Sequence, residues 1–179
     1  MGERAGKPRR PVIDPEAAAR SGLRSCLGRF ATGVAVVTFG GPAGPGERHG
    51  ITVNSFTSVS LDPPLVLVSV GKRARSHDLL RGRAFTVNVL GAEQEPVARC
   101  FAGGPPIELS WIEGEHAPRL TGVLAHLECT PWRAYDAGDH TLFLGEVAGY
   151  DFRDGDALAF LTSRFTILAE EQLGHEHLI

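Results

Sequence analysis

Residues 50–70 read GITVNSFTSVSLDPPLVLVSV, and the organisation that we expect for the whole chain follows from them. Apolar β-favouring residues alternate with small polar ones up to Leu61, which predicts a half-buried strand. Asp62-Pro63-Pro64 then breaks the pattern, and an apolar run continues to Val70. The stretch therefore predicts two strands joined by a tight turn.

Small polar side chains interleave with the apolar positions of the first of these strands. The spacing alone favours a structural interpretation, in which these side chains form the solvent-exposed face of an antiparallel strand. However, residues 52–55 bunch hydroxyl and amide groups beside Phe56. Such a bunch can hydrogen-bond the edge of a flat heteroaromatic ligand while the backbone lies close to it.

The flanking segments predict several more strands and few helices. Asp14-Pro15-Glu16 has the capping acid and the first-turn proline of a helix start. Leu23, Leu27 and Phe30 recur at helical spacing, so we expect this face in the core, and we expect the helix to end or bend at Gly33. A second helix is expected over 92–101, and further strands over 34–39, 84–90, 123–132, 157–161 and 165–168. Many short strands with glycine-rich turns are typical of an antiparallel barrel.

The totals suit one domain. The chain has 179 residues with 22 Gly and 12 Pro, which favours turns over long helices. A net charge of −3 gives no bulk field that would indicate nucleic acid or an anionic membrane as partner, and no apolar run reaches membrane-spanning length. We expect tails over 1–13 and 171–179 around a domain over 14–170.

The cysteines and the terminal histidines bear on compartment and metals. Cys26, Cys100 and Cys129 are odd in number and far apart, which favours free thiols in a reducing cytoplasm. His175 and His177 form a single H-x-H near the end of the chain, which is weak evidence for a metal ligand. We therefore expect a cytoplasmic protein without a metal site.

A cationic loop follows the central stretch. Residues 71–76 (GKRARS) hold three cations and a hydroxyl, and Ser76 is placed to cap a short helix over 77–80. One interpretation is a solvated charged loop. The other is a phosphate clamp, in which cations and backbone N–H groups meet an anion. The glycine-rich loop over 40–50 lacks the G-x-G-x-x-G fingerprint, so a Rossmann domain is not expected.

Several motifs along the chain point to one family. Residues 30–38 (FATGVAVVT), the stretch 50–70 and the Gly138-Asp139-His140 motif occur in one order, with Gly145 and Val147 after them. From about 23 to 168 the chain resembles the flavin reductase family, the small reductase components of two-component flavin monooxygenases. This resemblance implies a mainly β fold, a split β-barrel with Greek-key topology and a few short peripheral helices.

The same resemblance implies a reaction and its partners. Hydride would pass from NADH (or NADPH) to FAD (or FMN), and a separate monooxygenase component would receive the reduced flavin. The protein would be a homodimer with the flavin near the subunit interface. We favour FAD, and we favour NADH because no arginine pair stands out for the 2′-phosphate of NADPH.

The resemblance also assigns the site residues. The flavin ring and ribityl chain would contact Thr52, Val53, Asn54 and Ser55. The phosphates would lie among Ser69, Val70, Gly71, Lys72, Arg73 and Ser76. Phe101 and Ala102 would wall the flavin, His140 would orient the nicotinamide, and Gly33 would allow close approach. Phe165 stands where the family commonly has an aromatic residue with a hydroxyl.

Other functions fit parts of this pattern. A pyridoxamine-phosphate-oxidase-like flavin oxidase would share the barrel and keep its flavin as a prosthetic group. A non-catalytic flavin carrier or sensor would bind flavin without turning over NADH. A dimeric scaffold without a ligand would need none of the polar groups.

Overall fold

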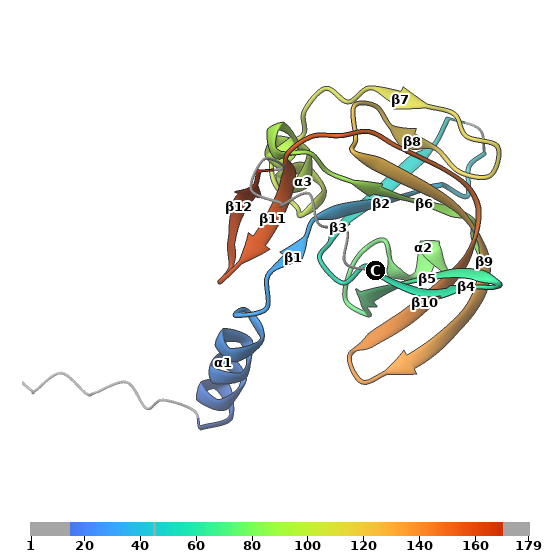
Figure 1. Cartoon of the computed structure of the whole chain (residues 1–179). Helices are drawn as coiled ribbons and strands as arrows, with labels where there is room; N and C mark the ends of the chain where they lie inside the picture. Colours follow the sequence, from blue (N-terminus) through green and yellow to red (C-terminus); the bar gives the residue numbers. More distant parts are fainter. Residues whose placement is uncertain (1–14, 45, 170–179) are drawn as a thin grey trace, which may run out of the picture.

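The computed structural model describes residues 15–44 and 46–169, and it is built around one curled antiparallel sheet (Figure 1). Its helices are α1 (Pro15–Leu27), α2 (His77–Leu80) and α3 (Glu95–Phe101), with the 3-10 turn η1 (Ala92–Gln94) before α3. Its strands are β1 (Thr32–Gly33), β2 (Ala35–Gly40), β3 (Arg48–Val53), β4 (Thr57–Leu61), β5 (Pro64–Gly71), β6 (Phe85–Val89), β7 (Trp111–Ile112), β8 (Arg119–Leu120), β9 (Ala125–Ala137), β10 (His140–Phe152), β11 (Ala157–Leu161) and β12 (Arg164–Leu168).

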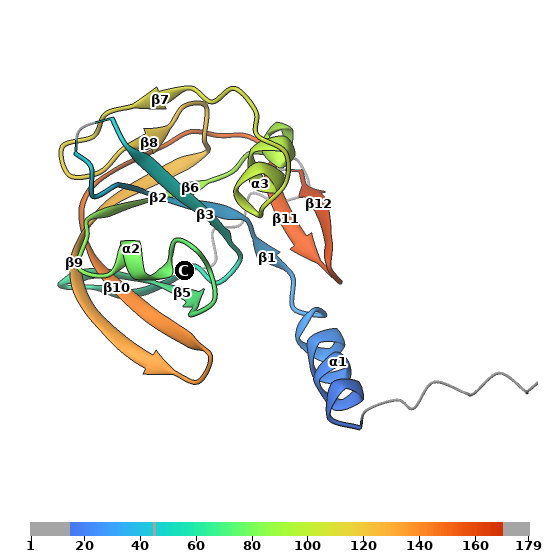
Figure 2. The same cartoon turned by 180° about the vertical axis from the view of Figure 1, so that it is seen from behind.

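The main sheet has seven strands in the order β3-β2-β6-β9-β10-β5-β4, and every pairing in it is antiparallel. Strands β3 and β4 follow one another along the chain but lie at opposite ends of this order. The sheet curls so that its two ends approach each other, as the front and back views show (Figures 1 and 2). This is the predicted split barrel, with its opening beside the stretch 50–70.

The first half of the stretch 50–70, which was predicted as one strand, forms two strands, the end of β3 and β4. Residues 54–56 leave the β3 ladder, and the chain then pairs with β5 as β4. Ser55 fastens this crossing, because its Oγ donates to the Ser69 carbonyl (2.7 Å) and accepts from the Ser69 N–H (3.0 Å). The alternation of residue types runs through both strands, so periodicity gave no sign of the interruption.

Two apolar clusters share strand β2. The barrel interior includes Val37, Phe39, Val68, Phe85 and Phe143, all almost fully buried. The second cluster uses Val36 of β2 and Val34 just before that strand, and packs them against Leu90, Ala98, Leu120 and Leu158. This second cluster joins the barrel to α3 and to the small sheet β1-β11-β12.

Helix α1 differs from its prediction in length and in surroundings. It ends at Leu27, before Gly33, and it projects away from the barrel (Figures 1 and 2). Leu23 is 59% exposed, Leu27 65% and Phe30, just beyond the helix, 78%. The prediction that this face packs in the chain's own core was therefore wrong. Helical periodicity indicates that the apolar face of a helix packs against another surface, but it does not show which surface that is.

Three smaller expectations can be compared with the structure. All three cysteines are free thiols. Within 15–44 and 46–169, no helix is long and apolar enough to cross a membrane, and no group of three or more metal-ligating side chains gathers. The predicted tails over 1–13 and 171–179, with His175 and His177, lie outside the described residues.

Candidate functional site

A pocket in the described part of the chain has a volume of about 850 Å³. It lies between β3, the cationic loop 71–76, α2 and the C-terminal end of α3. Five of the predicted site residues line it, namely Thr52, Arg73, Ser76, Phe101 and Ala102. The polar bunch, the cationic loop and the aromatic residue, which are far apart in sequence, therefore meet at one place.

Strand β3 and helix α3 form the aromatic wall of this pocket. The Thr52 hydroxyl donates to the Ala98 carbonyl of α3 at 2.7 Å. Gly50 lies under Phe101 so closely that a Cβ there would be 2.4 Å from the ring. The ring also meets Trp111 edge to face, with 6.1 Å between centroids. These contacts hold Phe101 against β3, where it lines the pocket.

The cationic loop forms the opposite wall. The Ser76 hydroxyl makes no capping bond to α2, contrary to the prediction, and instead donates to the Gly50 carbonyl at 3.4 Å. Lys72 points elsewhere, since its Nζ lies 3.2 Å from Asp136 Oδ1. Arg73 and Arg75 line the pocket, and among the described residues neither forms an ion pair. Two guanidinium groups are thus available to an anion, as a phosphate clamp requires.

His140 lies beside this loop and is not part of the pocket lining. It pairs with Gly71 across β10 and β5, and its Nε2 would be 3.6 Å from a Cβ at Gly71. Its Nδ1 is 2.7 Å from Asp139 Oδ1. The hydrogen bond with His140, followed by the charges of His140 and Arg73, holds the pKa of Asp139 below its ordinary value. The pair is open to solvent, where a second ligand can reach it.

Several predicted residues lie around the pocket without lining it. Asn54 is exposed at the crossing, and Ser55 is engaged with Ser69. Val53 and Val70 point into the barrel core, so only their backbones can face a ligand. Ser69 and Gly71 belong to β5, and Lys72 begins the loop after it.

Gly33 and Phe165 belong to the small sheet and do not line the pocket. Gly33 pairs with Ala159, and no atom lies within 4 Å of where its Cβ would be. Phe165 packs edge to face on Phe160, and the Arg99 guanidinium lies 5.1 Å above its ring. The single chain therefore does not bring these two residues into the pocket.

Sequence reasoning missed other lining residues, including His49, Arg75, Cys100, Gly103 and Gly104. Arg75 belongs to the cationic loop and could have been assigned with Arg73. Gly103 has a φ of +97°, the conformation that ends a helix, and a double glycine after a predicted helix is a readable sign of it. Nothing in the sequence marked His49 or Cys100.

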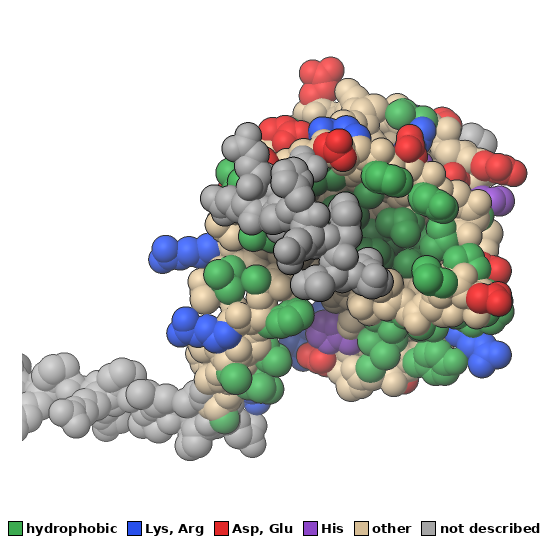
Figure 3. Space-filling view, viewed as in Figure 1, with side chains coloured by type: hydrophobic (Ala, Val, Ile, Leu, Met, Phe, Trp, Pro, Cys, Tyr) green, Lys and Arg blue, Asp and Glu red, His purple; other side chains and the backbone are tan. Residues whose placement is uncertain are grey.

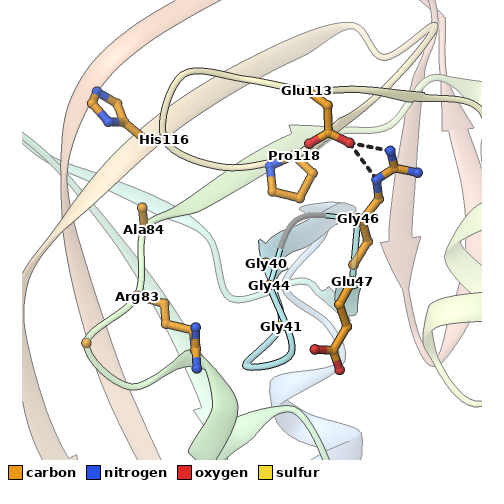
Figure 4. A pocket seen from close by; sticks show the side chains of 12 residues that line it. Gly40, Gly41, Gly44, Gly46, Glu47, Arg83, Ala84, Glu113, His116 and Pro118 are labelled. Atoms are coloured by element: carbon orange, nitrogen blue, oxygen red, sulfur yellow. Dashed lines mark hydrogen bonds and ion pairs between the residues drawn. The ribbon is translucent and has the colours of Figure 1, made fainter.

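A second pocket of about 430 Å³ lies at the β2–β3 hairpin (Figure 4). Arg48 pairs with Glu113 on one side, while Glu47 and Arg83 lie on either side of the hairpin glycines. The Ala43 N–H, followed by His49, lowers the pKa of Glu47. None of the predicted residues lines this pocket, and its cations are matched by acids. The larger pocket, with aromatic and cationic walls, is therefore the better candidate for a flat anionic ligand.

The size and walls of the larger pocket fit a flavin with its phosphate. A volume of about 850 Å³ lies within the range of small-molecule sites. The Phe101 ring can meet the face of an aromatic ring system, and the two arginines can meet a phosphate.

Comparison with known proteins gives a consistent picture. Residues 27–169 match the family described as flavin reductase like domain. An NADH-dependent flavin reductase from a Rhodococcus species is 41% identical, with 98% of this chain and 97% of that protein covered. The reductase component of a 4-nitrophenol 4-monooxygenase/4-nitrocatechol 2-monooxygenase from Rhodococcus opacus is 33% identical, with 80% and 78% covered. The Streptomyces globisporus NADH:FAD oxidoreductase SgcE6, solved with NAD and FAD fragments, is 43% identical with a TM-score of 0.77, and 91% of this chain and 99% of that one are covered.

Proposed function

This chain belongs to the flavin reductase family, and on that premise we propose that its larger pocket is the flavin site. The protein is an NAD(P)H-dependent flavin reductase that transfers hydride from NADH to FAD or FMN. It supplies the reduced flavin to a separate monooxygenase component. The relatives compared above are all reductases, so they give no support to the oxidase or carrier interpretations.

One observation carries the placement of the flavin. The Phe101 wall and the Arg73–Arg75 loop face the same pocket, although 26 or more residues separate them along the chain. An aromatic wall suits a flavin ring system, and guanidinium groups that form no ion pair with another described residue suit its phosphate. Phe101 alone could be an aromatic residue of the core, and the arginine loop alone could be a solvated surface loop. It is their meeting at one pocket that supports a flavin site.

The proposed roles of the residues follow from their positions. Arg73, Ser76 and the backbone of residues 69–72 hold the flavin phosphates. Phe101 and Ala102 lie against the ring system. Thr52 keeps α3 in place by donating its hydroxyl proton, and its oxygen can still accept a hydrogen bond from the ligand. Residues 53–55 contribute backbone contacts at the crossing. The nicotinamide and the flavin supply the redox chemistry, and the protein supplies orientation and close approach.

His140 is the proposed nicotinamide-positioning residue. It lies at the rim beside Gly71, and Asp139 holds its Nδ1, so that Nε2 is directed toward the loop. A hydrogen bond from this ring to the carboxamide or ribose would orient the nicotinamide over the flavin.

We therefore expect His140→Ala to lower kcat for NADH oxidation about tenfold while the flavin Kd changes less than twofold. Stopped-flow reduction and a flavin titration measure the two quantities. His116→Ala removes an exposed histidine outside the larger pocket and is the matched control. Equal losses of rate and flavin affinity in His140→Ala would contradict the assignment.

The test of the function itself is NADH oxidation by the purified protein. FAD, FMN and riboflavin are added in turn at equal concentration, and NADPH replaces NADH in a parallel series. We expect turnover that depends on added flavin, faster with NADH than with NADPH. No turnover with any flavin and either donor would overturn the function.

Assembly and compartment complete the proposal. We infer a cytoplasmic homodimer whose domain spans 14–170. The exposed apolar face of α1 supports a dimer, because a soluble chain seldom leaves such a face uncovered (Figure 3). Gly33 and Phe165 would then contact the flavin of a paired chain, which agrees with their absence from the pocket lining in their own chain.

A further inference from the structure

His77 is a buried histidine that the proposed mechanism does not use. It is the first residue of α2 and follows directly on the cationic loop. Only 4% of its surface is exposed, and its ring meets Phe143 edge to face with centroids 5.6 Å apart. A polar ring in the apolar end of a barrel is costly unless its nitrogens are hydrogen-bonded.

Both ring nitrogens have partners. Nδ1 lies 2.7 Å from Asp78 Oδ1, and because a carboxylate only accepts, this nitrogen carries the proton and donates. Nε2 lies 2.8 Å from the hydroxyl of Thr141, which is itself 1% exposed. The Nε2 contact is the only hydrogen bond of the Thr141 side chain to another described group. Each of these two buried polar groups therefore depends on the other.

The His77–Thr141 bond joins two parts of the site. His77 stands at the end of the loop that carries Arg73 and Ser76. Thr141 is the second residue of β10, directly after His140, and it pairs with Val70 on β5. The start of the loop is already tied to the same hairpin, since the Lys72 N–H donates to the Asp139 carbonyl at 2.9 Å. The loop is thus fastened to β10 and its turn at both ends.

We infer that His77 is a positioning residue that, through Thr141, fixes the cationic loop for the phosphate of the flavin. This inference rests on the proposed function. Leu80 anchors α2 in the barrel core, and backbone hydrogen bonds join Ala74 to Gly71 and His77. The side chains of the loop add little to this, because Arg73 and Arg75 are exposed and Ser76 makes only a long hydrogen bond to Gly50. Without the bond to Thr141, the first turn of α2 and the loop before it would be held less firmly, and the guanidinium groups would no longer be kept toward one anion.

Riboflavin separates this role from a general effect on the fold, because it has the flavin ring and ribityl chain but no phosphate. The quantity to measure is kcat/KM for FMN divided by kcat/KM for riboflavin, with NADH as donor. We expect His77→Ala and Thr141→Val each to lower this ratio about fivefold, the size of one lost hydrogen bond. His77→Gln, whose amide can still reach the Thr141 hydroxyl, should restore most of the ratio.

The outcomes are distinct. Thr141→Val keeps the shape of the side chain, so it tests the hydrogen bond even where His77→Ala fails to fold. A ratio that stays unchanged in Thr141→Val, or activity with both flavins falling together, overturns the role of His77. A wild-type ratio near one also overturns it, because the loop would then not recognise the phosphate, while the reductase function stands. Absence of wild-type turnover with either flavin would instead remove the proposed function.

Discussion

The three cysteines differ in their surroundings, and this difference gives a test of the pocket at the scale of one side chain. Cys26 is exposed, Cys100 lines the larger pocket, and Cys129 is buried in the barrel. Burial, followed by the charge of Glu128, raises the pKa of Cys129 to about 12. Because the thiolate is the nucleophile and a thiol with this pKa stays protonated at pH 8, iodoacetamide should spare Cys129 and modify the other two.

Bound flavin should protect the cysteine of the pocket. We expect saturating FAD to slow alkylation of Cys100 several-fold, as followed by mass spectrometry of the cysteine peptides. Cys26 lies on α1, in the proposed dimer interface, so its rate reports assembly and not the pocket. Alkylation of Cys100 at the same rate with and without FAD would contradict the placement of the flavin.

Gly50 offers a second test at the residue scale. Its missing side chain leaves room for Phe101, and a Cβ would be 2.4 Å from that ring. Gly50→Ala should therefore displace Phe101 from the pocket wall and raise the KM for FAD about tenfold, with a smaller loss of stability. Gly40→Ala is the matched control, because it lies on the neighbouring strand and has no atom within 4 Å of its Cβ position. Equal kinetics in the two variants would show that the Phe101 contact is not needed.

At the scale of elements, Ser55 holds the opening of the barrel. Its hydroxyl satisfies both backbone groups of Ser69 and so fastens the crossing between β3 and β4 onto β5. Ser55→Ala should lower the free energy of unfolding by about 1–3 kcal/mol, because these groups are partly buried and lose a partner. Urea unfolding measures the change. Ser58→Ala, on the exposed side of β4, should change stability by less than about 0.5 kcal/mol, and a similar loss in both would contradict the role of Ser55.

The same elements show what the sequence could and could not predict. The strands and helices that flank Pro63, Gly71 and Pro96 could be predicted, because turn-forming residues and apolar runs are local features of the sequence. The interruption at residues 54–56 could not be predicted, because the same alternation of apolar and polar residues continues before and after it. The sequence also did not show which of the predicted residues line the pocket, because this depends on the strand register. Val70 turns into the barrel, whereas Thr52 faces α3.

At the scale of the whole molecule, the unexplained feature is the helix α1. Its apolar residues Leu23 and Leu27 repeat at helical spacing, yet they remain exposed on a helix that projects from the barrel (Figures 1 and 3). In the homodimer that we propose, a second copy of the chain would cover this face, and Phe165 and Gly33 would face a pocket that they do not line in their own chain. The exposed helix and the two distant residues therefore have one explanation.

This explanation predicts that assembly and flavin binding are coupled. Sedimentation should give twice the chain mass of 19.1 kDa for the wild type. Leu27→Glu places a charge in the proposed interface, which should shift the protein toward monomer and weaken FAD binding about tenfold or more, since each site would lose its contacts with the second chain. Leu61→Glu is the control, because Leu61 is 93% exposed at the end of β4, away from α1 (Figure 1). If Leu27→Glu is a monomer that binds FAD as tightly as the wild type, the dimer exists but the flavin site is not shared between its chains. If the wild type itself sediments as a monomer, the proposed dimer is wrong.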